Sequence, residues 1–505
     1  MPTKSAIQTC LERELNKHIV RYGTHCQAVH QDRRRYHKRT GLASGPVSIV
    51  PPKHWDAHPQ FNPFYVRSRL ECLAYTLARR VRAGTYKPKP SLKVELKKPD
   101  GSSRGISIFT VCDAAVSYWL NERLTLRNAH YFSSYAYAYR IDRNVHHAIQ
   151  NLMRDIRGQK RLFVLEYDFS KYFDTISHEY VLEVLRQFKL SGREFDLVSN
   201  FLKNPQAEGI ANYKASTFVQ PQRGIPQGTS ISLFLANVAC YELDRGIEKI
   251  GVTFARYADD TLILTDSYEK ADACAKLLLQ HGTRSGTEVN FSKSSGISLL
   301  TQDPSPEMRR KDSVIYLAHK LSAEGISVSP KSIVRIKRKL SGIIYKNLLL
   351  QPKRGALSNN RIGPAFWDWD LVTCVNELRR YIYGGISENA VDAALSGTGP
   401  VMMTRSAMSF YPTIDFASTK CLRELDGWLI DVVSRAHTKR ARVLIGLGIA
   451  LSTPSRLQLI DGSWYSFTGL DHETRMPSFF KSWAYVKKCS KIFGLRRFPQ
   501  PLYGY

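Results

Sequence analysis

Apolar and polar positions alternate most clearly over residues 252–265, VTFARYADDTLILT, where two apolar runs flank a pair of adjacent aspartates. Alternation and β-branched residues predict two short strands joined by a tight hairpin, with Asp259 and Asp260 at its tip. Neighbouring carboxylates in an apolar hairpin repel one another and lose hydration, so a cation is expected to compensate them. A hard divalent metal such as Mg²⁺ fits this position, and an ordinary polar turn is the alternative.

Two other stretches have the composition of strands. Residues 161–167, RLFVLEY, are a short and mostly apolar run that ends at Asp168, which is an expected position for a metal ligand. Residues 93–96 and 106–109 are predicted to pair as a hairpin, because a Pro-Asp-Gly turn signal lies between them. The sequence therefore predicts strands that carry carboxylates at two separate places in the chain.

Helical periodicity begins near the N-terminus. Ile7, Leu11, Leu15 and Ile19 share one face of a predicted helix over residues 5–22, which Gly23 can end. Other helices are predicted at residues 66–83, 179–203, 232–241 and 331–347, and over most of residues 355–505.

Tyrosines alternate at one place between the predicted helices. Tyr135, Tyr137 and Tyr139 are two residues apart, which predicts that they share one face of a strand. Such a row packs in a core or stacks on nucleic-acid bases, and the pattern leaves both roles open.

Composition narrows the class of partner. The chain has 505 residues, of which 43% are hydrophobic, so it can bury a large core. Its 73 basic side chains outnumber 44 acidic ones, giving a formal net charge of +29. Such a field attracts polyanions, so nucleic acid is the leading partner, and a merely basic, soluble surface is the weaker explanation.

Cysteine usage and hydropathy exclude several classes of protein. Nine cysteines are scattered, without a CxxC pair or a Cys/His cluster, so a zinc site or a disulfide framework is not expected. This pattern fits a reducing cytoplasm. No membrane association is expected, because the longest uncharged apolar run, residues 443–451, is too short to span a bilayer.

Three sets of basic residues are candidate contacts with phosphates. The first is Arg33, Arg34 and Arg35 with Lys38 and Arg39, after the first helix. The second is Lys97 and Arg104, which flank the turn of the predicted hairpin, and the third is Arg335, Arg338 and Lys339 on the helix at 331–347. Each set is either an exposed solubilising surface or a phosphate contact.

Three motifs in order carry a family resemblance. DFSKYFDTIS begins at Asp168, RGIPQGTSIS begins at Arg223, and YADD ends at Asp260. They resemble motifs A, B and C of the reverse transcriptase palm. KKPDGSSRGISI resembles the fingers hairpin, GTEVNFSKSS resembles motif D with Lys293 at the lysine position, and VIYLAH resembles the primer-grip hairpin. The resemblance covers roughly residues 60–345 and is nearest to the bacterial defence-associated (unknown-group) reverse transcriptases.

The resemblance implies an α+β right-hand polymerase fold of fingers, palm and thumb, with an additional mostly helical C-terminal domain. We expect a basic N-terminal arm and helix at 1–60, the polymerase at 61–345 and the helical domain at 346–505. That last region matches no motif, and it is long enough to bind RNA or sister subunits, so a homo-oligomer is compatible with it.

The resemblance also implies catalytic and metal-binding roles. Asp168 and Asp259 would hold two Mg²⁺ ions, with the Phe169 carbonyl as a further ligand and Asp260 assisting. One ion would lower the pKa of the primer 3′-hydroxyl, and the other would stabilise the leaving pyrophosphate. Lys293 would protonate the leaving group, unless it is an ordinary surface lysine.

Roles in substrate binding follow from the same resemblance. Lys97 and Arg104 would neutralise the nucleotide phosphates, Gln227 and Gly228 would line the incoming nucleotide, and the ring of Phe173 would exclude a ribose 2′-hydroxyl. The basic thumb face of Arg335, Arg338 and Lys339 would follow the nucleic-acid backbone.

The function implied is RNA-directed DNA synthesis from deoxynucleoside triphosphates. An RNA template, expected to be a non-coding RNA, and a DNA product would be its partners, and antiviral defence would be its setting. The alternatives are an RNA-dependent RNA polymerase, against which YADD and Phe173 argue, a non-catalytic RNA-binding scaffold, and untemplated or protein-primed synthesis. Tyr503 and Tyr505 are candidate hydroxyls for protein priming.

Overall fold

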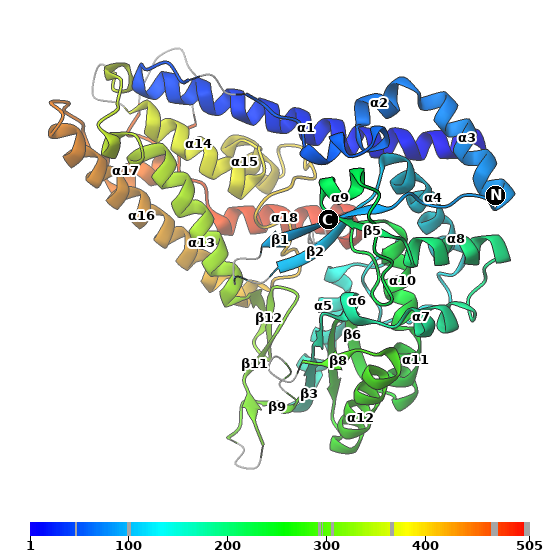
Figure 1. The fold of residues 1–505 in the computed structure, drawn as a ribbon. Helices are drawn as coiled ribbons and strands as arrows, with labels where there is room; N and C mark the ends of the chain where they lie inside the picture. Colours follow the sequence, from blue (N-terminus) through cyan, green and yellow to red (C-terminus); the bar gives the residue numbers. More distant parts are fainter. Residues whose placement is uncertain are drawn as a thin grey trace.

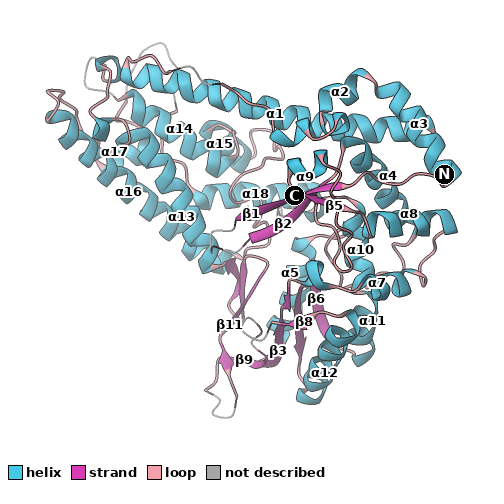
Figure 2. Cartoon of the chain, in the orientation of Figure 1, coloured by secondary structure: helices cyan, strands magenta, loops and turns pink. Residues whose placement is uncertain are grey.

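The computed structural model describes residues 1–45, 48–97, 101, 103–290, 294, 296–304, 308–363, 368–465 and 473–498. Helices form most of the molecule, and the strands gather into a few small sheets (Figures 1 and 2). No helix in these ranges is long and apolar enough to cross a bilayer.

The largest sheet that the structure describes is the five-stranded palm sheet. Its strand order is β10-β9-β3-β7-β6, and β3 lies antiparallel to both β9 and β7. The pairing of Leu165 with Ile263 fixes the register of the two central strands. The strands are β3 (Arg161–Tyr167), β6 (Thr253–Tyr257), β7 (Asp260–Thr265), β9 (Gly296–Thr301) and β10 (Arg310–Lys311).

One helix covers each face of the palm sheet. Val164 belongs to the core that includes α5 (Val145–Gly158), whereas Leu165 belongs to the core that includes α12 (Tyr268–Ser285). Successive residues of β3 therefore point to opposite faces, as the period of a strand requires. Because both faces are buried, the palm strands are continuous apolar runs, and the predicted strand at 161–167 is confirmed.

The fingers lie beside the palm. The predicted hairpin forms as β1 (Ser91–Lys97) and β2 (Ser103–Ile108), and the short β5 (Gln206–Glu208) joins it to give the order β2-β1-β5. The helices around it are α2 (Pro63–Ser68), α3 (Leu70–Ala83), α4 (Val111–Arg127) and α9 (Ile210–Lys214), with short 3-10 turns at Lys53–Asp56 and Pro59–Phe61.

The chain forms further short elements outside these two sheets. They are β4 (Phe169–Ser170), α6 (Tyr172–Thr175), α7 (His178–Leu185), α8 (Gly192–Leu202), α10 (Ile231–Ala239), α11 (Tyr241–Ile250) and β8 (Glu288–Val289), which pairs with β4.

Residues 135–139 do not form the predicted strand. They lie in turns with only a single bridge, from Ala136 to Arg256, and Tyr139 has a left-handed backbone with φ of 60°. The backbone N–H of Tyr137 donates to the Arg256 carbonyl at 2.9 Å, so the segment packs along the edge strand β6. Tyr137 is buried in the core, which favours packing over base stacking for that residue.

The first helix is longer than the sequence pattern predicts. Helix α1 (Lys4–Thr40) begins at an N-cap on Thr3 and continues through Gly23 to Gly41, whose φ of 71° ends it. Its N-terminal half packs on α3 and α4 of the fingers, and its far end reaches the C-terminal region (Figure 1). The predicted helix end at Gly23 is therefore wrong, and the basic cluster at residues 33–39 is helical.

A small antiparallel sheet and a helix follow the palm. The sheet consists of β11 (Ser313–Tyr316), β12 (His319–Ser322) and β13 (Gly325–Val328), and we call it the β11–β13 sheet. It leads into α13 (Pro330–Ile344), the predicted thumb helix, whose last turn widens into a π-helix at Tyr345–Leu349.

The C-terminal region is mostly helical, as predicted. Its helices are α14 (Trp369–Tyr383), α15 (Glu388–Ser396), α16 (Lys420–Ile445), α17 (Arg456–Asp461) and α18 (Phe479–Phe493), with short 3-10 turns at Pro352–Arg354, Asn359–Arg361, Phe416–Thr419 and Leu495–Arg497.

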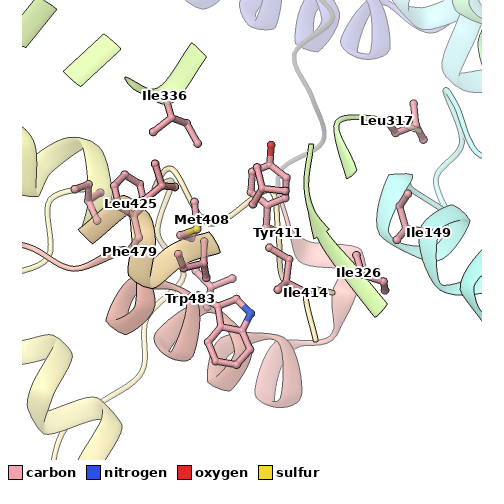
Figure 3. Close-up of a cluster of buried hydrophobic side chains, with 14 of the residues drawn as sticks. Ile149, Leu317, Ile326, Ile336, Met408, Tyr411, Ile414, Leu425, Phe479 and Trp483 are labelled. Carbon is pink, nitrogen blue, oxygen red and sulfur yellow. The ribbon is translucent and has the colours of Figure 1, made fainter. Parts of the chain in front are cut away.

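The C-terminal region shares a core with the polymerase segment. Figure 3 shows Tyr411 and Ile414 between Ile336 of α13 and Ile326 of β13, in a cluster that extends to Ile149 of α5. Asp415 adds polar contacts, since its carboxylate accepts from the Ile326 N–H at 2.9 Å and from the Arg157 guanidinium at 2.5 Å. The division at residue 346 stays a prediction.

Candidate functional site

Strands β6 and β7 place the two adjacent aspartates at a turn. Tyr257 pairs with Asp260, so only Ala258 and Asp259 connect the strands. We call residues 257–260 the YADD turn. Ala258 has φ of 61°, a left-handed conformation that costs a non-glycine residue about 1–3 kcal/mol and occurs mainly where function demands it. The predicted hairpin is confirmed.

Asp168 follows the neighbouring strand β3. Its backbone carbonyl accepts from the Asn290 N–H at 2.8 Å, and its own N–H donates to the Ser294 hydroxyl at 3.2 Å. Tyr167 pairs with Thr261, the second residue of β7, so the two strands bring Asp168 to the side of the YADD turn. Asp168 and Asp259 thus interact although 90 residues separate them in the chain (residues 169–258).

The pKa of Asp259 is raised, first by burial and next by the negative charge of Asp168. The guanidinium groups of Arg104 and Arg256 lower it in part. A cation beside these two carboxylates would offset the burial and the negative charge that raise the pKa of Asp259. Hard oxygen donors suit Mg²⁺, which binds through one or two carboxylates and substrate phosphates, so Asp168 and Asp259 fit this ion.

Asp260 is more exposed to solvent than Asp168 and Asp259 are. Its side chain is exposed at the start of β7, and its backbone carbonyl accepts a hydrogen bond from Tyr316. Among the residues whose placement is described, no three His, Cys, Asp or Glu side chains gather to hold a metal. Roles for Asp260 and for the Phe169 carbonyl in metal binding stay predictions, although the buried Phe169 ring packs on Tyr172 and His281 and holds that backbone in place.

Arg256 is a residue at this site that sequence reasoning missed. Its guanidinium donates to the Ala258 carbonyl at 3.0 Å and forms an ion pair with Asp244 of α11, with both side chains 1% exposed. The Arg256 side chain therefore holds the YADD turn from within the core. An arginine inside an otherwise apolar strand is the sequence signal that could have identified it, because arginine is almost never fully buried without a partner.

The fingers hairpin contacts the glycine-containing loop at residues 223–230. The Ser107 N–H donates to the Gln227 carbonyl at 2.7 Å. Gly228 has φ of 127°, and a Cβ there would collide with the Ser107 carbonyl oxygen. Only glycine permits this close approach, which joins the loop to β2.

Side-chain hydrogen bonds also connect the hairpin, the loop and Asp174. Arg104 Nε donates to Gln227 Oε1, and Gln227 Nε2 donates to Asp174 Oδ1 at 2.8 Å. Two of the residues predicted to bind nucleotide, Arg104 and Gln227, are thus in direct contact. Lys97 is exposed at the end of β1.

Phe173 lies at a cavity of about 330 Å³ between the hairpin and the loop. Its ring is half-buried, and its carbonyl accepts from the Ile225 N–H at 2.7 Å, which anchors the backbone. Lys171, Asp174, Arg223 and Gln227 also line the cavity. The predicted gate residue and the predicted nucleotide-binding glutamine therefore line one cavity.

The remaining predicted residues lie elsewhere. Arg335, Arg338 and Lys339 are exposed on α13. Lys293 and the two terminal tyrosines, Tyr503 and Tyr505, lie outside the described residues.

A comparison with known families decides the class of this site. The profile of the family described as "Reverse transcriptase (RNA-dependent DNA polymerase)" matches residues 96–321. Residues 96–321 belong to the reverse transcriptase family. This reverse transcriptase segment contains Asp168, Phe173, Gln227 and the YADD turn. The family match confirms the expected right-hand polymerase fold, to which the helical C-terminal region is added.

Curated relatives match the same part of the chain. Protein YkfC of Escherichia coli (strain K12) is 26% identical over 187 residues, which are 36% of this chain and 48% of YkfC. The group II intron-encoded protein LtrA of Lactococcus lactis subsp. cremoris is 24% identical over 183 residues, 36% of this chain and 29% of LtrA. The chain thus spans at most about half the length of these relatives.

One solved structure is similar to this chain at lower sequence identity. Telomerase from Candida albicans, in complex with a TWJ fragment of telomeric RNA, aligns with a TM-score of 0.40 and 12% sequence identity. The alignment covers 81% of this chain and 68% of that one.

Proposed function

We propose that this protein is an RNA-directed DNA polymerase that adds deoxynucleotides by two-metal nucleotidyl transfer. The observation that supports this most is the electrostatic coupling of Asp168 with the half-buried Asp259 at the YADD turn, inside the reverse transcriptase segment. Bound Mg²⁺ would activate the primer 3′-hydroxyl and stabilise the leaving pyrophosphate.

The residues of the chain have distinct parts in this proposal. Asp168 and Asp259 hold the metal ions, and Asp260 and the Phe169 carbonyl assist. Arg104 and Lys97 neutralise the triphosphate, and Gln227 keeps the Arg104 guanidinium turned toward the palm. Phe173 excludes ribonucleotides. Lys293 is the proposed proton donor to the leaving group.

An RNA is the proposed template, and a non-coding RNA the proposed partner. The net charge of +29 and the exposed basic residues of α13 support a polyanionic partner. All nine cysteines are free thiols, which supports a reducing cytoplasmic setting. A role in antiviral defence rests on the motif resemblance alone, and plating phage on cells with and without the gene tests it.

The test of the activity is incorporation of labelled deoxynucleotides by the purified full chain. Three reactions are compared: an RNA template with a DNA primer, a DNA template, and no template. We expect Mg²⁺-dependent synthesis with the RNA template, and its loss in Asp259→Asn. Asp266→Asn is the matched control, because Asp266 is an exposed aspartate that follows the other end of β7.

Other outcomes assign the protein to the alternatives. Synthesis without template would indicate untemplated addition, and label that stays on the denatured protein would indicate protein priming. Template-dependent synthesis that survives in Asp259→Asn would contradict the assignment of this site. Tight RNA binding without any incorporation would indicate a scaffold.

A further inference from the structure

Tyr316 connects two parts of the molecule that the catalytic residues alone do not connect. It is the last residue of β11 in the β11–β13 sheet and is 6% exposed. Its hydroxyl lies 2.8 Å from the carbonyl oxygen of Ala255 and 3.1 Å from that of Asp260. Ala255 belongs to β6 and Asp260 to β7, so one hydroxyl contacts both strands of the YADD hairpin.

The YADD turn needs such support. Ala258 holds a left-handed backbone without being glycine, and β6 is the edge strand of the palm sheet. Arg256 holds the turn from the core through the Ala258 carbonyl. Tyr316 supports the same turn from another direction, because its hydroxyl reaches the turn from β11, which belongs to a separate sheet.

The position of Tyr316 is itself fixed. The next two residues, Leu317 and Ala318, form the β11–β12 turn with φ of 45° and 66°. Hairpin turns with two positive φ values favour Asn-Gly, so Leu-Ala is strained here. His319 Nδ1 lies 2.8 Å from the Leu317 carbonyl, which can only accept, so this nitrogen carries the proton and holds the turn.

The C-terminal region supports this turn from outside. The His319 ring is fully buried and packs against Phe410 and Tyr411, with ring centroids 5.4 and 5.0 Å away. Figure 3 shows Tyr411 in the cluster that also contains Leu317. A continuous chain of contacts therefore runs from the C-terminal region through His319 and Tyr316 to the YADD turn.

We propose that Tyr316 is a positioning residue for nucleotide addition, which sets the YADD turn relative to the β11–β13 sheet. The inference rests on the proposed polymerase function. Because the Tyr316 hydroxyl contacts both strands that present Asp259, it sets where that carboxylate lies relative to Asp168. The C-terminal region then acts on catalysis through this contact, without touching substrate.

The test is Tyr316→Phe in the full chain, which removes one hydroxyl and keeps the ring. Tyr180→Phe is the matched control, because Tyr180 is a 3% exposed palm tyrosine that donates to the Ala239 carbonyl at 3.2 Å. Single-turnover synthesis on a primed RNA template separates the reaction amplitude, which reports folded enzyme, from the rate constant. We expect the rate constant of Tyr316→Phe to fall about tenfold with the amplitude unchanged, as for the loss of one useful hydrogen bond.

Hydrogen exchange gives a readout that does not need activity. Amides of residues 253–265 should exchange about tenfold faster in Tyr316→Phe than in the wild type, and Tyr180→Phe should not change them. A Tyr316→Phe variant with a wild-type rate constant or with wild-type exchange overturns the inference. A wild type that makes no DNA instead contradicts the proposed function, which distinguishes the two failures.

Discussion

The guanidinium of Arg256 and the carboxylate of Asp244 meet at two points behind the YADD turn, with Nε 2.7 Å from Oδ1 and Nη2 2.6 Å from Oδ2. Both side chains are essentially excluded from solvent. The remaining Nη1 group donates to the Ala258 carbonyl. A buried charge pair thus holds the backbone that presents Asp259.

Removing one partner of this pair should be costly. In Arg256→Met the Asp244 carboxylate would stay buried without its cation, and we expect the free energy of unfolding to fall by about 3–5 kcal/mol. Urea denaturation measures it. The control is Arg284→Met, since Arg284 is 53% exposed and pairs with Glu183 and Glu242 at the surface. A loss of about 1 kcal/mol or less is expected for that variant. Equal losses in the two variants would contradict this account.

Acid should weaken the palm through His281. Burial lowers the pKa of His281 from 6.5 to about 4, while its Nε2 lies 3.1 Å from the Tyr172 hydroxyl. As pH falls below 6.5, His281 becomes protonated in the unfolded chain but stays neutral in the folded one. The free energy of unfolding therefore falls until about pH 4. The loss due to this residue is on the order of 3 kcal/mol.

Melting curves between pH 7 and pH 4 check the His281 prediction. His281→Phe should show a smaller loss of stability over this range than the wild type does. His25→Phe, a change of an exposed histidine on α1, should follow the wild-type curve. Parallel curves for wild type and His281→Phe would show that this histidine contributes nothing to acid sensitivity.

The choice of sugar should depend on Phe173. Replacing its ring by the smaller side chain in Phe173→Val should raise the ratio of ribonucleotide to deoxyribonucleotide incorporation on the order of tenfold, because the proposed exclusion is steric. Competition between the two nucleotide types on one template measures this ratio. Phe163→Val, which changes a half-buried phenylalanine on β3, is the control. An unchanged ratio would make Phe173 a packing residue.

The thumb face should contribute to the salt dependence of RNA binding. Changing Arg335, Arg338 and Lys339 to Gln should reduce the log–log slope of affinity against salt by about 2–3, since each phosphate contact with a duplex contributes about 0.9. Filter binding at several salt concentrations measures the slope. The control changes Lys249, Lys270 and Lys276, which are exposed on the helices that cover the outer palm. Equal slopes for all three proteins would place the duplex elsewhere.

The elements next to the carboxylates could be predicted because local and tertiary preferences agree there. Residues 161–167 and 252–265 are mostly apolar and rich in residues that favour strands, so the strands and the YADD turn follow from pattern alone. The spacing of Asp168 from Asp259 gains meaning only through the motif resemblance, since periodicity does not say which strands are neighbours. The pairing of β3 with β7 supplies that information.

Three features escaped prediction for tertiary reasons. Gly23 costs a helix about 1 kcal/mol, yet α1 continues because contacts at both ends stabilise it. Arg256 is hidden in an apolar strand, and its partner Asp244 lies on another element. Alternation at residues 135–139 suggested a strand, but the segment has no ladder partner beyond one bridge.

Helix α1 has a consequence for how this chain can vary. Its fingers contacts, Ile7, Leu11 and Leu15, and its C-terminal contacts, Arg35 to Glu377 at 2.6 Å and Arg39 to Asp370 at 3.2 Å, belong to one unbroken helix. One inserted or deleted residue between them rotates one set against the other by about 100° and breaks the far contacts. A seven-residue change nearly restores the phase but shifts the far end by about 10 Å. The length of this helix is therefore fixed by angular phase as well as by distance. This constraint applies to the middle of α1, although most side chains there are exposed to solvent.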